Sequence, residues 1–147
     1  EENYDYVEDE LNILENFISL KLRLMFNEKP NNEKEVQDNL ERLFIGNNMN
    51  KGVDYDRETG KFNFSGREYI PDFIFPNLKC CLEAKLLKET SKKSKMIEEI
   101  NADITAYTKV YNEIIFLVYD IGVIPDVLEF KRDIENSGNV KVIVVKH

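Results

Sequence analysis

Residues 68–87 read EYIPDFIFPNLKCCLEAKLL, and this stretch predicts two β-strands joined by a short turn. We assign the strands to residues 68–75 and 80–87 and the turn to the four residues between them. Successive side chains of a strand point to opposite faces, so Glu83 and Lys85 share one face of the second strand. Burying either charge alone would cost several kcal/mol. The two side chains therefore need each other or a ligand.

Asp72 is a further charged residue within an otherwise apolar strand. If residues 76–79 form the turn, Phe75 pairs with Cys80 and Asp72 lies directly opposite Glu83. Directly paired residues share a face, with Cβ atoms about 5 Å apart. A shift of one residue in the pairing would put the two carboxylates on opposite faces. In the predicted register the carboxylates repel each other, and a divalent cation between them would relieve that repulsion.

Helices and further strands are predicted on both sides of this segment. Residues 6–26 carry a helical apolar stripe, a second helix spans 33–46, and residues 53–56 and 61–64 are expected to form a hairpin. After the central segment the pattern predicts a helix that begins near Ser91 or Ser94, a buried strand at 114–119, a helix at 126–136 and a strand at 140–145. This order predicts an antiparallel meander followed by α/β crossovers that add parallel strands to the same sheet.

Composition narrows the chemistry. The 147 residues fit one domain, and the only histidine, His147, is the last residue of the chain. Zinc hydrolases, HNH-type nucleases and Ser-His-Asp or Cys-His enzymes all need a placed imidazole, so these classes are excluded. A metal ion held by this chain would have to be a hard cation with carboxylate ligands, which means Mg²⁺ or Mn²⁺.

The charge of the chain is unevenly distributed. A net charge of −8 taken alone argues against a nucleic-acid partner, because phosphate binding favours basic surfaces. Residues 79–95 nevertheless hold six lysines against two glutamates. A solvated helix start explains such a cluster as well as a binding surface does.

The remaining features concern location and boundaries. Cys80 and Cys81 are neighbours on one strand and point to opposite faces, which predicts two buried thiols in a reducing cytoplasm rather than a disulfide or a zinc site. No apolar run approaches the roughly 20 residues of a membrane span. The first residue is Glu rather than Met, so we expect a fragment of a longer protein.

The segments Ile70-Pro71-Asp72 and Glu83-Ala84-Lys85 together resemble the motif of the PD-(D/E)XK nuclease superfamily. The resemblance implies an α/β fold with a restriction-endonuclease-like core, in which helices flank a mixed central sheet. Residues 33–147 would form that core, and residues 1–30 would add an N-terminal helical extension. In this family the two acidic residues bind Mg²⁺ and the lysine positions or activates the attacking water. Asp72 and Glu83 become metal ligands by this resemblance, and Lys85 becomes the residue beside the nucleophile.

Many members add a glutamate from the helix before the sheet. Glu35 lies eleven residues before Gly46, a spacing that resembles the Holliday-junction-resolvase and Mrr-like branches, and it is our fourth catalytic and metal-binding candidate. Its close competitors in the same helix are Glu33, Asp38 and Glu41. Some RecB-like members also have a Gln-x-x-x-Tyr motif after the lysine strand. The nearest match begins at Asp103 in place of glutamine, and its Tyr107 is interpreted as a core residue.

The function implied is that of a metal-dependent phosphodiesterase, an endonuclease acting on DNA rather than RNA, in restriction or phage defence. The nucleic-acid backbone would be held by lysines beside the site: Lys88, Lys92, Lys93 and Lys95. The alternative is a catalytically inactive domain of the same fold that binds nucleic acid or a protein partner. The apolar N-terminal helix suggests a homodimer or a fused domain packed on its outer face.

Overall fold

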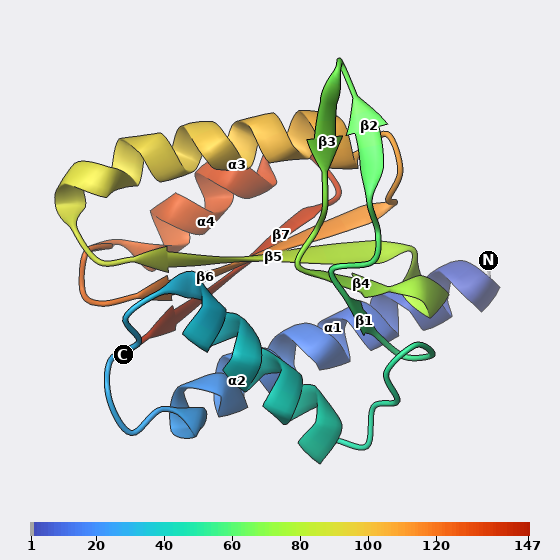
Figure 1. The fold of residues 1–147 in the computed structure, drawn as a ribbon, viewed down its shortest axis with the longest axis horizontal. Coiled ribbons are helices and arrows are strands. Elements are labelled where there is room, and N and C mark those ends of the chain that lie inside the picture. Colours follow the sequence, from blue (N-terminus) through green and yellow to red (C-terminus); the bar gives the residue numbers. More distant parts are fainter. Residues whose placement is uncertain (1) are drawn as a thin grey trace.

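The computed structural model describes residues 2–147, with side chains from residue 6 onward, and its centre is a mixed five-stranded sheet (Figure 1). The strand order is β1-β4-β5-β6-β7, and β2 and β3 form a separate two-stranded sheet. The strands are β1 (Asp56–Arg57), β2 (Phe62–Phe64), β3 (Arg67–Tyr69), β4 (Phe73–Phe75), β5 (Cys80–Leu87), β6 (Glu113–Asp120) and β7 (Val140–Lys146). The helices are α1 (Glu2–Lys21), α2 (Glu33–Gly46), α3 (Lys93–Tyr107) and α4 (Val127–Glu135), with short 3₁₀ turns η1 (Leu22–Met25), η2 (Pro76–Leu78) and η3 (Thr90–Lys92).

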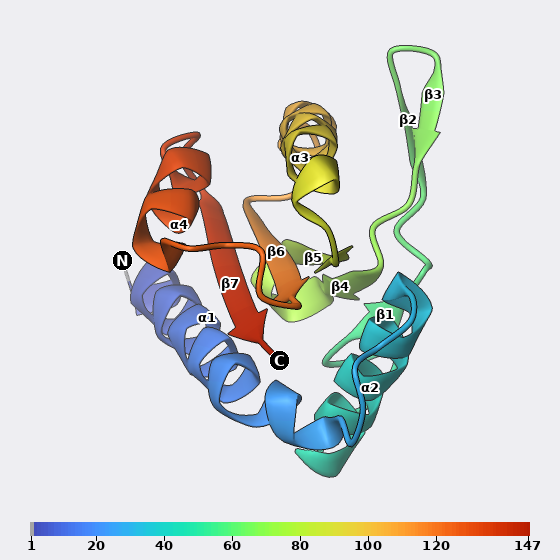
Figure 2. The same ribbon diagram turned by 90° about the vertical axis from the view of Figure 1, so that its left-hand side faces the viewer.

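Helices cover both faces of the sheet (Figure 2). α1 and α2 lie against one face, and α3 and α4 lie against the other. β5, β6 and β7 run parallel because α3 and α4 return the chain across the sheet between them. The near-continuous apolar sequence of β6 follows from this arrangement, since a strand covered on both faces has few positions open to water.

β5 separates the two halves of the core. Cys80, Leu82 and Ala84 point into the half under α1 and α2, and Cys81 and Leu87 point into the half under α3 and α4. Glu83 and Lys85 share this second face and are each only 8% exposed. The predicted alternation of this strand is therefore confirmed, and two charged side chains lie in a largely apolar layer.

The predicted register is also confirmed. β4 pairs with β5 antiparallel, with Phe75 opposite Cys80 and Phe73 opposite Leu82. Asp72 precedes Phe73, so the same register sets Asp72 opposite Glu83. The four-residue connection 76–79 contains η2 and ends at Lys79, which has a left-handed backbone with φ 48°.

Two predictions about the preceding strands are wrong. Residues 68–75 do not form one strand, because the chain leaves the ladder at Ile70-Pro71-Asp72 and Pro71 has no N–H to donate. The hairpin does not join 53–56 to 61–64. It joins β2 to β3 through Ser65-Gly66, whose φ angles of 51° and 76° suit a tight hairpin turn.

The N-terminal helix forms part of the core. Its predicted stripe is buried at Leu11, Leu14, Ile18 and, in η1, Leu22. Within the residues described, no helix combines the length and the apolar character that crossing a membrane would require.

Candidate active site

The carboxylates of Asp72 and Glu83 each accept a hydrogen bond from the backbone of the other segment, where β4 diverges from β5. The Asp72 N–H donates to Glu83 Oε1 at 3.0 Å, and the Ala84 N–H donates to Asp72 Oδ2 at 2.8 Å. The backbone leaves the β-ladder at Pro71. The Asp72 side chain therefore accepts the hydrogen bond from the Ala84 N–H in place of a backbone carbonyl. These two hydrogen bonds fix both carboxylates beside the central strand β5, at the point where β4 begins.

Burial of the two carboxylates raises both pKa values. Burial is the largest cause for each; it raises the pKa of Asp72 to about 6 and, with the neighbouring Asp72 charge, that of Glu83 to about 8. Hydrogen bonds from Ala84 to Asp72 and from Tyr107 to Glu83 offset part of this effect. Negative charge is thus unfavourable here until a positive group joins the pair.

The oxygens left over fit a hard cation. Asp72 Oδ1 and Glu83 Oε2 accept no hydrogen bond from the residues described, and no buried side-chain oxygen or nitrogen in that part lacks a partner, so both oxygens reach solvent. The described residues contain no group of three or more His, Cys, Asp or Glu side chains arranged to hold a metal ion. Two carboxylates are nonetheless what Mg²⁺ commonly takes from a protein, with water and substrate phosphate completing its octahedron.

Lys85 lies in the same layer but pairs with α3. Its Nζ is 3.4 Å from Asp103 Oδ2 and 3.8 Å from Glu99 Oε2. Burial lowers the pKa of Lys85, but Asp103, Glu83, Glu33 and Glu99 together outweigh it and raise the pKa above its ordinary value. Lys85 therefore stays protonated near neutral pH.

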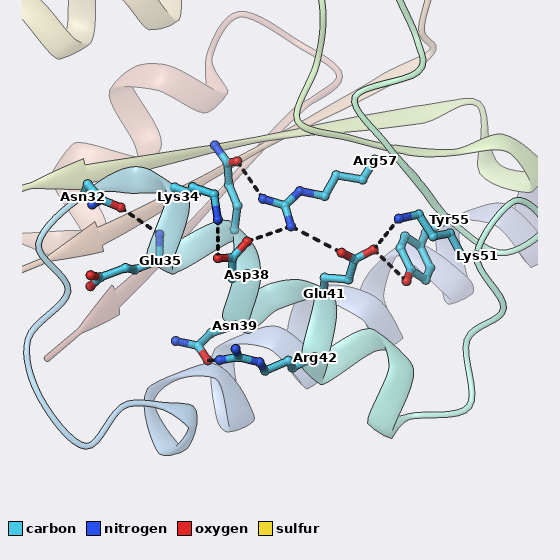
Figure 3. A network of polar contacts seen from close by, with 11 residues as sticks. Asn32, Lys34, Glu35, Asp38, Asn39, Glu41, Arg42, Lys51, Tyr55 and Arg57 are labelled. Atoms are coloured by element: carbon cyan, nitrogen blue, oxygen red, sulfur yellow. Dashed lines mark hydrogen bonds and ion pairs between the residues drawn. The ribbon is translucent and has the colours of Figure 1, made fainter.

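The structure does not bring Glu35 to this cluster, which corrects our choice among the acids of α2. The Glu35 carboxylate accepts hydrogen bonds from the backbone and side chain of Asn31. Asp38 and Glu41 are engaged by Arg57, at 2.8 and 3.3 Å (Figure 3). The remaining acid, Glu33, is the one close enough to Asp72 and Lys85 to influence the pKa values of both.

The position of Glu33 could have been read from the sequence. It lies seven residues before Leu40 and eleven before Phe44, and both of these residues are fully buried. At 3.6 residues per turn all three share one side of the helix, the side that faces the sheet. Glu35 lies on a different side of the helix, away from these three residues.

α3 supplies two side chains to the site. Tyr107 is buried, as predicted for a core residue, but its hydroxyl donates a 2.8 Å hydrogen bond to Glu83 Oε1. Asp103 lies one helical turn earlier and holds Lys85. The sequence signal that could have identified both residues is their spacing of four, which puts the two side chains on one face of the helix. The Asp-x-x-x-Tyr match therefore belongs to the site despite lacking the glutamine.

If Glu83 is the metal ligand that the sequence predicts, replacing Tyr107 with phenylalanine should reduce DNA cleavage by about 10- to 100-fold, the usual effect of losing an outer partner of such a ligand. The hydroxyl stabilises the charged form of Glu83, so its loss raises the Glu83 pKa further and moves the activity profile to higher pH. Plasmid-cleavage rates measured across pH would show both effects. Tyr55→Phe is the matched control, because the hydroxyl of the buried Tyr55 also donates to a glutamate, Glu41, but in the other half of the core. Equal losses in the two variants would contradict this role.

The four predicted DNA-binding lysines do not share one surface. Lys88, Lys92 and Lys95 are exposed, and Lys88 Nζ donates to the carbonyl of Asn31 before α2. Lys93 is half-buried in a pocket shared with Asp126, Glu129 and Asp133, on the side of α3 that faces α4. The structure thus separates Lys93 from the other three.

An open cleft of about 380 Å³ leads from solvent to Lys85. It is lined by Arg67, Lys85, Glu98, Glu99, Ala102 and Asp103. Three of these residues are acidic, and the carboxyl groups of Asp72, Glu83 and Glu33, which become negative on losing their protons, also lie near Lys85. A polyanion could approach this surface closely only with a cation present.

The mixed sheet, its helical layers and the N-terminal helix define a restriction-endonuclease-like domain. A family model described as REase_DpnII-MboI matches residues 29–147, so the chain belongs to the DpnII–MboI family of restriction endonucleases and is a DNA nuclease. Comparisons with curated proteins and with solved structures gave no match.

Proposed function

We propose that this chain is a metal-dependent endonuclease of the PD-(D/E)XK type that hydrolyses DNA in restriction or phage defence. The observation that supports this most is the pair of Asp72 and Glu83. Their carboxylates are fixed by two hydrogen bonds, carry raised pKa values and keep one oxygen each open to solvent. A carboxylate with a purely structural role does not need an oxygen open to solvent, whereas a carboxylate that binds a cation does.

In this proposal Asp72 and Glu83 hold Mg²⁺ or Mn²⁺. The ion supplies Lewis-acid polarisation of the phosphate and lowers the pKa of a bound water. Lys85, already protonated, orients the attacking water and stabilises negative charge on the reacting phosphate. Asp103 and Glu99 position Lys85, and Tyr107 positions Glu83.

Glu33 replaces Glu35 as the proposed fourth acid. The resemblance to the Holliday-junction-resolvase and Mrr-like branches depended on the spacing of Glu35. We therefore propose that the chain belongs to the PD-(D/E)XK superfamily and assign it to neither branch. Glu33 is accessible at the first turn of α2 and could bind the ion through water. Lys88, Lys92 and Lys95 are proposed to hold the DNA backbone beside the site, and Lys93 is left out.

Metal removal and pH test this proposal together. Cleavage of plasmid DNA should require Mg²⁺ or Mn²⁺ and stop in EDTA. Because a proton must leave Glu83, with pKa about 8, before an ion binds, the apparent Mg²⁺ affinity should rise with pH between about 6 and 8. For one displaced proton the gain is about tenfold per pH unit. Cleavage rates at a series of Mg²⁺ concentrations and pH values measure this affinity.

Saturating Mg²⁺ is the control, since the pH dependence should then become shallower. Cleavage that continues in EDTA would contradict metal dependence. If no DNA or RNA substrate is cut with either metal, the inactive, binding-only alternative is the correct one.

We also propose that the exposed face of α1 and η1 contacts a second copy of the chain. Leu20 and Leu24 are 73% and 75% exposed, and Tyr6 and Ile13 are also exposed apolar residues of α1. Two copies would let both DNA strands be cut. A light-scattering mass equal to one chain at micromolar concentration would contradict the dimer.

A further inference from the structure

The β2–β3 hairpin projects from the body of the molecule beside α3 (Figures 1 and 2). It is a two-stranded sheet of its own, and its Ser65-Gly66 turn is exposed. A projecting ribbon of two strands has the width that the DNA major groove admits. The hairpin has no role in the proposed hydrolysis of the phosphodiester bond.

The base of the hairpin is fixed to the end of α3 by aromatic packing. Phe62 and Tyr69 lie with ring centroids 5.8 and 6.0 Å from Tyr107, and Tyr111 donates a hydrogen bond to the carbonyl of Gly60. A side chain at Gly60 would collide with Tyr111 and with Ile74. The hairpin therefore has a set orientation relative to the helix that positions Glu83 and Lys85.

Arg67 lies on the face of the hairpin that looks toward α3. In the strand pairing it stands opposite Phe64, on the side shared with Phe62 and Tyr69. Its guanidinium rests 5.3 Å from the centre of the Tyr69 ring. It lines the same cleft as Lys85 and is close enough to influence the pKa of Asp103.

The outer face of the hairpin differs. Asn63 is paired with Glu68, and Glu68 forms a 3.0 Å ion pair with the exposed Lys61. Arg67 is the cation that β3 contributes to the inner side of the hairpin, at the edge of the cleft that holds Lys85 and three acids. The Nζ of Lys109, which follows α3, lies 6.0 Å from the centre of the Phe64 ring on the same side. A guanidinium held on an aromatic ring keeps its donors available for a phosphate, which it can bind through two hydrogen bonds.

We propose that duplex DNA lies over the cleft formed by the β2–β3 hairpin and α3, with the hairpin tip in the major groove and Arg67 on a backbone phosphate next to the one cut. This assignment rests on the proposed function, because the position of the cut phosphate is set by Asp72, Glu83 and Lys85. The partner is double-stranded DNA rather than a single strand, since a single strand has no groove for the ribbon.

The test is equilibrium binding of the full chain to a fluorescent mixture of random-sequence duplexes, with Ca²⁺ in place of Mg²⁺. Arg67→Ala should weaken binding at least tenfold and reduce the slope of log Kd against log salt by about one, as expected for one lost phosphate contact. Arg67→Lys should recover part of the affinity, since it restores the charge without the bidentate geometry. Lys61→Ala is the matched control: it removes the same charge from the outer side of the same hairpin and should change Kd less than threefold.

Unchanged binding by Arg67→Ala overturns the proposal, and so does an equal loss in Lys61→Ala, which would indicate only a general charge effect. Equal binding of single-stranded DNA by the wild-type chain overturns the duplex assignment.

The proposed catalytic function is tested separately from the hairpin assignment. If Glu83→Gln abolishes cleavage while Arg67→Ala binds normally, only the hairpin assignment fails. If no metal supports cleavage while Arg67→Ala still weakens binding, only the catalytic proposal fails.

Discussion

Replacing Glu83 with glutamine is expected to abolish DNA cleavage and to stabilise the metal-free chain. Glutamine keeps the shape of the side chain and can still accept from the Asp72 N–H and the Tyr107 hydroxyl, but it offers no negative charge to a cation. We expect a loss on the order of 10³-fold or more, above the 10- to 100-fold typical of outer partners. Plasmid cleavage at saturating Mg²⁺ and pH 8 measures the loss.

The stabilisation follows from the raised pKa of Glu83. The folded chain binds this proton up to about pH 8, whereas an unfolded glutamate releases it near its ordinary pKa of 4.5. The folded state therefore holds more protons in that interval, and the free energy of unfolding falls as pH rises through it. Glutamine removes this penalty, so we expect Tm in EDTA at pH 8 to rise by about 3 °C or more.

Glu113→Gln is the matched control for activity. Glu113 is another strand glutamate with a raised pKa, but it is half-buried and pairs with Cys80 at the far end of β5. Its replacement should leave cleavage unchanged. A Glu83→Gln chain that cuts DNA at the wild-type rate would remove Glu83 from the catalytic site.

Replacing Lys85 with alanine should reduce cleavage by about 10²- to 10³-fold, the usual cost of removing one preorganised stabiliser of transition-state charge. Because Lys85 is already protonated, its loss should lower the rate at all pH values without removing an inflection of the pH profile. The inflection that belongs to Glu83 should move to higher pH, since the charge of Lys85 lowers the Glu83 pKa. Single-turnover cleavage rates across pH would separate this effect from a lost base. The variant should also be less stable, since Asp103 would remain half-buried without its cation.

Lys141→Ala provides the comparison. Lys141 is also a strand lysine held between two acids of a helix, Glu8 and Glu15, but it lies on β7, the edge strand two positions away from β5. Its replacement should affect stability without affecting catalysis. If Lys85→Ala raises Tm and leaves cleavage intact, Lys85 is a structural charge and not a catalytic one.

The sequence was sufficient to predict the centre of the fold. The alternation in β5 and the length of the turn at 76–79 set the register of β4 and β5, and that register puts Asp72 opposite Glu83. Both signals are local: one is a repeat of two residues and the other a count along the chain. The parallel strands β6 and β7 followed from their continuous apolar sequences and the helices between them.

The partners of these residues depend on tertiary packing and were harder to predict. Glu33 is the exception, because it shares one side of α2 with the buried Leu40 and Phe44, whereas our choice of Glu35 used its distance from Gly46. The roles of Asp103 and Tyr107 depend on where α3 crosses β5. The hairpin was misplaced because Arg57-Glu58-Thr59-Gly60 and Ser65-Gly66 are both acceptable turns, and pairing of β1 with β4 decides between them.

A crystal structure of the chain soaked with Mn²⁺, with the ion located by its anomalous scattering, tests the central claim most directly. We predict one ion bound between Asp72 Oδ1 and Glu83 Oε2 at coordination distance, about 2.1 Å for an ion of this kind, with water in the remaining positions and Lys85 still paired with Asp103. Manganese bound elsewhere on the chain, with these two carboxylates left free of metal, would contradict it.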